Sequence, residues 1–364
     1  MSAINISDTL IDFFVDVKEN RDIKVLQITD TQIIDSSQIR DARRLSSDED
    51  DYWSKKSIDE RCFNTVREVI SKVEPDLIII TGDLIYGEFD DSGTSLLKFI
   101  EFMEGFKIPW APVFGNHDNE SAKGADWQSE KLSEAEHCFF KQRNLTGNGN
   151  YTVGIKSQGV LKRVFVMLDS NGCGALSEAS LKNGHSKSSP GFGADQINWY
   201  SETISEIRGV NPELKISFAF HIQPFAFENA MKKYGFENNR QSFDPVNIDL
   251  LKEKPEGDFG YIGNVLKDPW DIERAVWQGI KSLGADSVFV GHEHANSASV
   301  IYDGIRCQYG QKTGTYDRNN YLQEEGSYIC SYLEAGVPIS GGTAIFISQD
   351  DGLIKEAKII LSDN

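Results

Sequence analysis

The stretch Leu77-Ile-Ile-Ile-Thr-Gly-Asp83 sets the fold class of this 364-residue chain. Its apolar run carries no polar residue on either face, which is typical of a strand buried on both sides in a parallel sheet. A helical pattern over Phe63–Val73 precedes it, and Pro75 ends that helix. A buried strand that directly follows a helix indicates an α/β fold.

Strand-like runs and helical patterns alternate on both sides of this stretch, which supports the same fold class. Further strands are predicted at Ile23–Thr29, Trp110–Phe114, Val164–Leu168, Lys215–Phe220 and Ser287–Val290. Helices are predicted at about Thr94–Phe106, Asp195–Ile207 and Trp270–Leu283. We also expect Leu10–Val17 to pair with Ile23–Thr29. Glycine-rich or charged stretches predict loops near Ser36–Lys56, Glu120–Glu130, Asn183–Gly193 and Phe227–Asp268.

The C-terminal part changes character, because short strands follow one another there without helices between them. They lie at Ser297–Tyr302, Ile305–Tyr309 and Thr343–Ser348. This pattern predicts a second, largely antiparallel sheet packed on the first. There are no repeats and no long linker, so we expect a single domain over residues 1–364, with its core at about 22–350.

Composition narrows the classes of partner. The chain has 37 basic and 56 acidic side chains and a net charge of −19, so its surface should repel long nucleic acids and anionic lipid. No apolar run approaches the roughly 20 residues of a membrane span. The five cysteines are widely spaced and form no CxxC, which argues against a disulfide framework and fits a reducing compartment. With no basic region before its first apolar stretch, the chain is expected to be soluble and cytoplasmic. Its oligomeric state cannot be inferred.

Polar residues follow five of the predicted strands, at the point where each strand ends. They are Asp30, Gly82-Asp83, Gly115-Asn116-His117-Asp118, His221 and Gly291-His292-Glu293-His294. Four of the six histidines fall in these five places, which random scatter would rarely produce. Because ligands bind at the carboxyl ends of strands in open α/β sheets, we expect these side chains to meet at one edge of one sheet.

Such a cluster has the chemistry of a metal site. Imidazole and carboxylate ligands together suit Zn, Fe, Mn or Co. An aspartate can bridge two cations, and two metals about 3.5–4 Å apart can hold the attacking and leaving oxygens of a phosphoryl transfer. In an extended segment, His292 and His294 face the same side, where each can bind a different metal.

The order of these motifs resembles the calcineurin-like metallophosphoesterase family. The resemblance rests on Asp30-Thr-Gln32, Gly82-Asp83, Gly115-Asn116-His117-Asp118, His221 and Gly291-His292-Glu293-His294, and it spans nearly the whole chain. In detail the chain is most similar to single-domain members related to purple acid phosphatases. The resemblance implies a two-sheet β-sandwich flanked by helices, which is a four-layer αββα fold.

The resemblance also implies a role for each residue. The metal ligands would be Asp30, Asp83 and His294 for the first metal, and Asp83, Asn116, His221 and His292 for the second, with Asp83 as the bridge. His117 would contact the scissile phosphate and act as acid or transition-state stabiliser, and Asp118 would orient His117. The implied reaction is hydrolysis of a phosphomonoester, phosphodiester or pyrophosphate by a metal-bound hydroxide. A small phosphorylated molecule or a phosphoprotein is the expected substrate.

One position departs from the family pattern, because Gln32 stands where Asp-x-His is usual. A glutamine can ligate through its amide oxygen, and this hard ligand favours Mn or Fe over Zn at the first metal. Tyr86 offers a second reading, since Gly82-Asp83-Leu-Ile-Tyr86 resembles the GDxxY of purple acid phosphatases, where the tyrosine ligates ferric iron. A third alternative is a catalytically silent regulatory module that has lost the usual histidine.

Overall fold

The structure, a computed structural model, describes residues 10–38, 57–171, 191–233, 257, 274–294, 296–314, 332–333, 337–338 and 340–363. Most of its described strands form two large sheets. The five-stranded sheet has the order β14 (Ile354–Leu361), β13 (Gly341–Ile347), β2 (Ile23–Ile28), β3 (Leu77–Thr81) and β4 (Trp110–Val113). The seven-stranded sheet has the order β1 (Phe13–Val17), β5 (Tyr151–Ser157), β6 (Val160–Met167), β7 (Lys215–Ala219), β8 (Ser287–Val290), β10 (Ile305–Tyr309) and β9 (Ser299–Tyr302). Two short strands, β11 (Tyr332–Leu333) and β12 (Val337–Pro338), pair separately.

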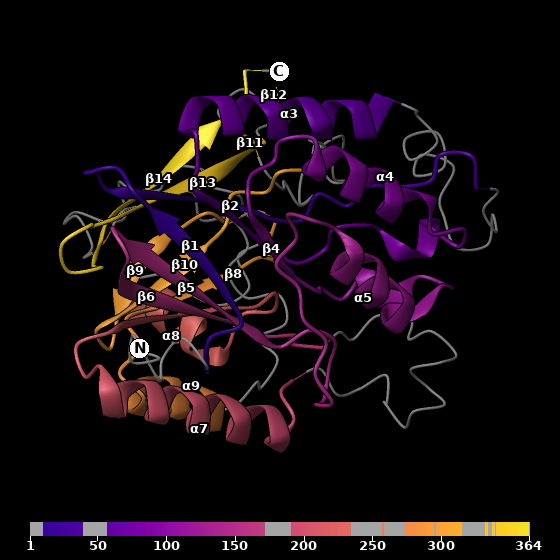
Figure 1. The fold of residues 1–364 in the computed structure, drawn as a ribbon. Coiled ribbons are helices and arrows are strands. Elements are labelled where there is room, and N and C mark those ends of the chain that lie inside the picture. The colour runs from indigo at the N-terminus through magenta and orange to yellow at the C-terminus, as the bar shows by residue number, and fades with distance from the viewer. Residues whose placement is uncertain are drawn as a thin grey trace.

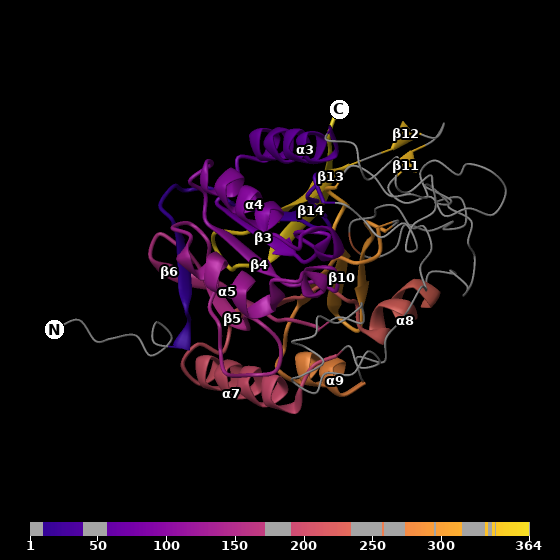
Figure 2. The ribbon, with the colours of Figure 1, turned by 90° about the vertical axis from the view of Figure 1, so that its right-hand side faces the viewer.

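Helices cover the outer face of each sheet, as Figures 1 and 2 show. On one side lie α3 (Ser57–Val73), α4 (Thr94–Glu104) and α5 (Gly124–Glu134). On the other side lie α7 (Ala194–Val210), α8 (Phe225–Lys233) and α9 (Arg274–Ser282). The result is the four-layer αββα arrangement, so the fold class inferred from the sequence is confirmed.

Strand β6 shows how one strand serves two cores. Phe165 and Met167 belong to the core shared with the five-stranded sheet, whereas Val164 and Val166 belong to the core under the second group of helices. All four side chains are fully buried, because successive strand residues point to opposite faces and both faces here are covered. Leu77–Thr81 is buried along its whole length for the same reason.

The structure corrects two strand pairings. The strand β1 does not pair with β2; it pairs in parallel with β5 in the other sheet, with Phe13 opposite Val153. The C-terminal strands do not form a sheet of their own. Strands β10 and β9 extend the seven-stranded sheet, whereas β13 pairs antiparallel with β2 of the other sheet. The chain therefore crosses between the sheets after β10. Local sequence patterns do not predict which sheet a strand joins.

Two predicted loops contain helices. Residues 124–134 form α5, although its apolar residues do not repeat strongly enough to predict it, and α8 extends to Lys233 inside the predicted loop Phe227–Asp268. The rest of that loop apart from residue 257, and parts of those at Ser36–Lys56 and Asn183–Gly193, lie outside the described residues, as does the start of the predicted helix Trp270–Leu283. Within the described ranges, no helix combines the length and apolarity needed to cross a bilayer. The single-domain assignment stays a prediction.

Candidate metal centre

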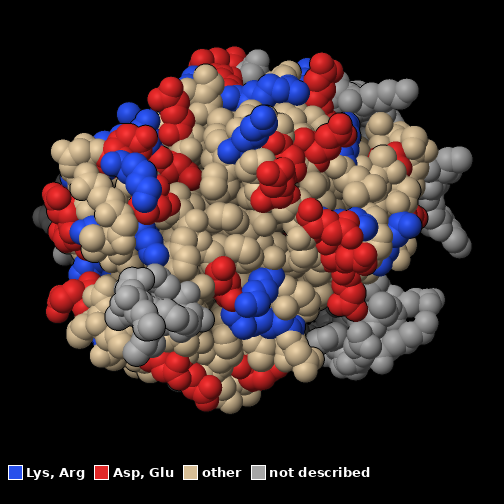
Figure 3. Space-filling view, in the orientation of Figure 1, with Lys and Arg blue, Asp and Glu red and all other residues tan. Residues whose placement is uncertain are grey.

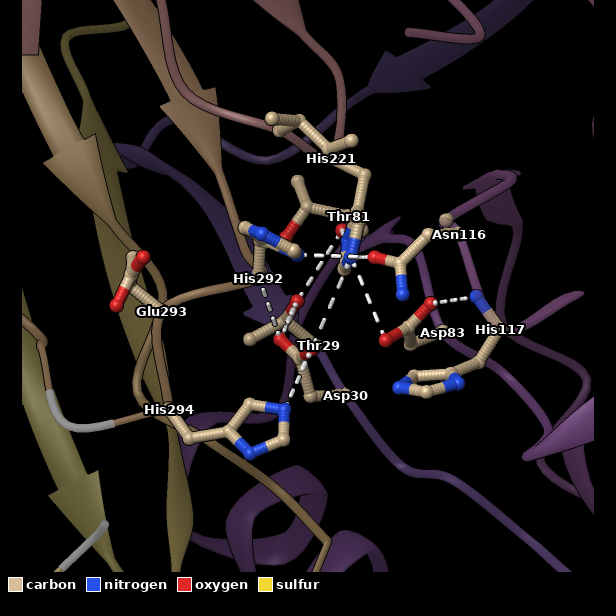
Figure 4. A network of polar contacts seen from close by, with 12 residues as sticks. Thr29, Asp30, Thr81, Asp83, Asn116, His117, His221, His292, Glu293 and His294 are labelled. Carbon is tan, nitrogen blue, oxygen red and sulfur yellow. Dashed lines mark hydrogen bonds and ion pairs between the residues drawn. The ribbon is translucent and has the colours of Figure 1, made fainter. Parts of the chain in front are cut away.

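The five segments named from the sequence converge, but they come from both sheets and not from one. Asp30, Asp83 and Asn116 follow β2, β3 and β4 of the five-stranded sheet, whereas His221 and His292 follow β7 and β8 of the seven-stranded sheet. Figure 4 shows their side chains pointing into one space between the sheet ends. The prediction of one edge of one sheet was wrong, because strand ends of two packed sheets open onto the same rim.

The backbone at the site is unusual. Asp30, Gln32, Asp83 and His292 have φ angles of 52°, 47°, 53° and 69°, in the left-handed region that non-glycine residues rarely adopt. Hydrogen bonds hold two of them in place, from the Asp30 amide to Gly82 O (3.0 Å) and from the Gln32 amide to Asp83 O (2.9 Å). Strained residues of this kind gather where a functional geometry must be kept.

Glycines at the strand ends allow side chains to approach the backbone closely. A Cβ on Gly115 would lie 2.2 Å from Asp83 Oδ1, and one on Gly291 would lie 2.1 Å from Thr29 Oγ1. Of the glycines preceding Asp83, Asn116 and His292, only Gly82 has a positive φ. Close approach, more than a sharp turn, is therefore what requires glycine before Asn116 and His292.

The residues expected at the second metal are called here the second position, and they are Asp83, Asn116, His221 and His292. Their donor atoms point toward one another. Asn116 Oδ1 lies 2.9 Å from His292 Nδ1 and 3.1 Å from His221 Nε2. His221 Nε2 lies 3.4 Å from Asp83 Oδ2. His221 Nδ1 lies 2.7 Å from the carbonyl oxygen of Thr81 and donates to it, which fixes Nε2 as the ring atom that faces the site.

These spacings fit a metal ion. Donors bound about 2.1 Å from one cation lie roughly 3.0–3.4 Å from each other. Asn116 Oδ1 and Asp83 Oδ2 both accept, and His221 Nε2 carries a lone pair once Nδ1 donates to Thr81. Three buried acceptors in mutual contact repel one another unless a positive charge lies between them, and either a proton on the His221 ring or a bound metal ion supplies that charge. Imidazole, carboxylate and amide oxygen together suit Mn, Fe or Zn.

The pKa values show that the field of the buried carboxylates favours positive charge. Burial lowers the pKa of His221, but the carboxylates of Asp83 and Asp30 outweigh it and raise it to about 10. Burial raises the pKa of Asp83, yet His221 and His117 outweigh burial and hold it far below its usual range. Burial, reinforced by His221, lowers the pKa of His292 to about 3, so that its ring stays neutral and keeps a lone pair for a cation.

The residues expected at the first metal, called here the first position (Asp30, Gln32, Asp83 and His294), are also in contact. Asp30 Oδ1 lies 3.2 Å from His294 Nε2, and its Oδ2 accepts from Thr29 Oγ1 at 2.7 Å. Ligand atoms of Asp30, Asp83 and His221 all lie within 4.8 Å of one another, so the two positions adjoin. This agrees with Asp83 as a bridge between them.

Gln32 belongs to the cluster, but its amide oxygen is engaged elsewhere. Its Nε2 lies 3.3 Å from Asp83 Oδ2, whereas its Oε1 accepts a hydrogen bond of 2.9 Å from Lys312 Nζ. The oxygen that would bind a metal therefore faces a lysine ammonium. Sequence analysis missed Lys312, because no motif marks it and it lies 20 residues beyond His292.

His117 lies beside the metal ligands and is held from three sides. Its amide donates to Asp83 Oδ1 at 2.9 Å, its Nδ1 lies 2.7 Å from Glu120 Oε2, and its ring stacks on Tyr86 with centroids 4.0 Å apart. Burial lowers the pKa of His117, but Asp83 and Glu120 outweigh it and raise it to about 9. A protonated imidazole at neutral pH is what a general acid requires.

The carboxylate that contacts His117 is Glu120 and not Asp118, which corrects the role predicted for Asp118. A single 3-10 turn, η2 (Asp118–Glu120), places Glu120 next to the His117 ring. The buried carboxylate of Asp118 instead accepts from the amides of Gly115 (2.7 Å) and Ile85 (3.0 Å). Burial, followed by the Asp83 charge, raises the pKa of Asp118 to about 8. Asp118 therefore joins the loop after β3 to the loop after β4 through these hydrogen bonds.

Glu293 lies apart from the ligands on either side of it. In Figure 4 its carboxylate points away from the space shared by His292 and His294. The segment is not extended, which corrects the prediction from the sequence, because His292 has a φ of 69° and the amide of Glu293 donates to Gly291 O at 2.8 Å. A tight turn, and not strand alternation, sets the directions of these side chains.

Comparisons with known proteins give a consistent family. The model described as calcineurin-like phosphoesterase matches residues 23–296. Phosphatase DCR2 of Saccharomyces cerevisiae is 40% identical over 101 residues, which cover 25% of this chain and 17% of that protein. The "Probable inactive purple acid phosphatase 28" of Arabidopsis thaliana is 35% identical over 152 residues, which cover 38% of this chain and 37% of that protein. The match thus spans well under half the length of either relative.

Among solved structures, a dimetal phosphatase from Danio rerio superimposes with a TM-score of 0.53. The alignment covers 94% of this chain and 99% of that one at 13% sequence identity, so it speaks to the fold alone.

Proposed function

This chain belongs to the calcineurin-like phosphoesterase family, whose model matches it over residues 23–296, and we propose that it hydrolyses phosphate esters at a two-metal centre. The observation that supports this most strongly is the contact among buried acceptors at Asp83, Asn116 and His221. Two bound cations would neutralise phosphoryl oxygens and make water more acidic. The first and second positions would hold them, and the favoured metals are Mn or Fe, with Zn as the other candidate.

In this proposal His117 supplies the proton. Glu120 holds Nδ1 at 2.7 Å, which leaves Nε2 to face a substrate, and stacking on Tyr86 fixes the plane of the ring. With a pKa raised by Asp83 and Glu120, the imidazolium can protonate the leaving oxygen or stabilise its charge. Glu120 takes the orienting role first given to Asp118.

The substrate proposed is a small phosphorylated molecule or a phosphoprotein. Support comes from charge, since the net charge of −19 disfavours a long polyanion. In Figure 3, basic and acidic side chains intermingle over the face shown and the basic ones do not form a broad patch. A compact phosphate group can still be attracted by the metals themselves.

A catalytically silent regulatory module is the second candidate function. It is favoured by the contact between Gln32 and Lys312 at the first position and by the word "inactive" in the name of one relative. A purple acid phosphatase with an Fe(III)–Tyr86 bond is the third. Support for it comes from the sequence pattern, whereas the ring of Tyr86 stacks on His117 and packs against Phe89 in the structure.

The test is phosphate release from aryl phosphate monoesters and diesters with metal-free protein to which Mn²⁺, Fe²⁺ or Zn²⁺ is returned. Turnover that His117→Asn reduces while metal content stays constant supports the proposed hydrolase. Folded protein that binds metal and turns over no ester under any of these metals supports the silent module. A purple colour in the isolated protein supports the Tyr86 alternative, and a colourless, active Mn²⁺ form removes it.

A further inference from the structure

A buried lysine lies inside the proposed metal centre. The side chain of Lys312 is 1% exposed. Its Nζ donates to Gln32 Oε1 at 2.9 Å and lies 3.2 Å and 3.4 Å from His294 Nδ1 and Nε2. These partners, Gln32 and His294, are two of the three residues that belong to the first position and not to the second.

The backbone fixes this lysine in place. The next residue, Thr313, donates its amide to Thr29 O at 3.0 Å, and the Thr29 amide donates to Thr313 Oγ1 at 3.1 Å. Gly314 donates to Asp30 O at 3.1 Å, and a Cβ on Gly314 would lie 2.4 Å from that oxygen. Hydrogen bonds therefore join the two residues after Lys312 to Thr29 and Asp30, and Asp30 is a proposed ligand at the first position.

The ammonium acts on a metal at the first position in two ways. It holds the amide oxygen of Gln32, so that a cation there loses one of its four candidate ligands. It also repels the cation directly. Nζ lies 3.4 Å from His294 Nε2, so a metal bound to that nitrogen at about 2.1 Å could lie no further than roughly 5.5 Å from Nζ.

Among the described residues, no lysine or arginine contacts the donors of the second position. Its donors, on Asn116, His221 and His292, contact one another and the carboxylate of Asp83. We propose that Lys312 makes the first position the weaker of the two, so that the protein binds one metal tightly and a second one loosely. This inference rests on the proposed two-metal function.

The direction of the effect identifies the role of the lysine. Repulsion between an ammonium and a divalent cation at roughly 5.5 Å, even with the dielectric constant of water, corresponds to about a tenfold change in affinity. Lys312→Met should therefore tighten metal binding at the first position by about tenfold or more and at the more distant second position by a smaller factor. Lys312→Arg keeps the charge and should keep the first position weak.

The experiment is equilibrium dialysis of metal-free, full-length protein against a range of free Mn²⁺, with bound metal measured by elemental analysis. Electron paramagnetic resonance on the same samples shows when two Mn²⁺ ions are close enough to couple. The wild-type protein should fill in two well-separated steps, and Lys312→Met in two closer ones. Lys98→Met is the matched control, because it removes a lysine on α4 that pairs with Asp59 at 2.8 Å and lies outside the cluster.

Two results with Lys312→Met would overturn the inference. Weaker binding at the first position in Lys312→Met would mean that the lysine is a neutral ligand, and unchanged binding would mean that it has no influence. Lys312→Gln, which can still bond to Gln32, guards against a folding defect and must show the part of the tightening that comes from loss of the charge, in a protein with an unchanged circular dichroism spectrum. If no variant and no wild-type sample binds any metal, the proposed function fails with it, whereas two equal, strong positions in the wild type overturn this inference alone.

Discussion

Replacing Glu120 by glutamine tests the least expected contact at the proposed site. Glutamine keeps the size of the side chain and a hydrogen-bonding oxygen, but removes the charge that faces His117 Nδ1 at 2.7 Å. Both side chains are mostly buried, with exposed fractions of 10% for Glu120 and 20% for His117. Solvent therefore screens the pair only in part, and the loss of charge should be felt strongly at the ring.

The magnitude follows from the hydrogen bond. A bond to a charged group contributes about 1.5–3 kcal/mol, which corresponds to roughly one to two pH units in the pKa of its partner. Glu120 is one of the carboxylates that hold the pKa of His117 at about 9 against burial, so this pKa should fall in Glu120→Gln. Cations bound to Asp83 lower the starting value in both proteins, so the difference between them is the quantity to measure. A ring held less firmly should also lower kcat by about 10- to 100-fold.

The assay is the pH dependence of kcat for an aryl phosphate, with bound metal measured in parallel. The alkaline limb, where His117 loses its proton, should move to lower pH by roughly one to two units. Metal content should stay unchanged, because Glu120 contacts none of the proposed ligands except through His117. Glu134→Gln, at the exposed end of α5, is the control. An unchanged alkaline limb together with an unchanged kcat would refute the assignment of Glu120 as the positioning residue.

The remaining predictions concern metal binding and stability. Asn116→Ala should lower metal occupancy and activity together, whereas His117→Ala should lower activity about 10²- to 10⁴-fold with both metals retained, as elemental analysis and kinetics will show. Gly291→Ala places a Cβ 2.1 Å from Thr29 Oγ1, so unfolding should become about 1–3 kcal/mol easier in a denaturant titration. Chelation should lower the melting temperature, because metal at a thousand times its Kd stabilises by about 4 kcal/mol. For Asp12, burial raises the pKa, but a lysine and an arginine outweigh it and depress it below 3.8. Its ionised form therefore stabilises the fold above that pH, and Asp12→Asn should cost about 2 kcal/mol near pH 7 and progressively less as the pH falls through the acid range.

The strands that carry ligands could be predicted closely because their signal is local. Leu77–Thr81 has an uninterrupted apolar run, and its observed bounds match the predicted ones. The same is true of Ile23–Ile28 and of Ser287–Val290 to within a residue. Burial on both faces leaves no room for polar residues, so the first polar side chain after each run marks the end of the strand and the edge of the site.

The partition of strands between sheets could not be predicted, because pairing is a long-range property. Strand β13 pairs with β2, more than 300 residues away in the chain, and the sequence of β13 does not indicate which strand it pairs with. The same limit applies within the site. Glu120 becomes a neighbour of His117 through one 3-10 turn, and Lys312 reaches Gln32 only because residues after β10 bond to the end of β2. Motifs mark residues that bind metal, but not the residues that position or oppose them.

The location of the centre between two sheets explains why its two metal positions differ. Both positions join loops of the two sheets, the second through Asn116 and His221, after β4 and β7, and the first through Asp30 and His294, after β2 and β8. A cation at the second position would be bound by side chains that already contact one another across the two sheets. The first position is closed instead by the segment after β10, which brings a lysine to the amide oxygen that a metal would need. That segment is bonded to Thr29, directly after β2, so the backbone next to the lysine is tied to the five-stranded sheet. The unequal affinity inferred for the two positions is thus a consequence of how the chain crosses from one sheet to the other.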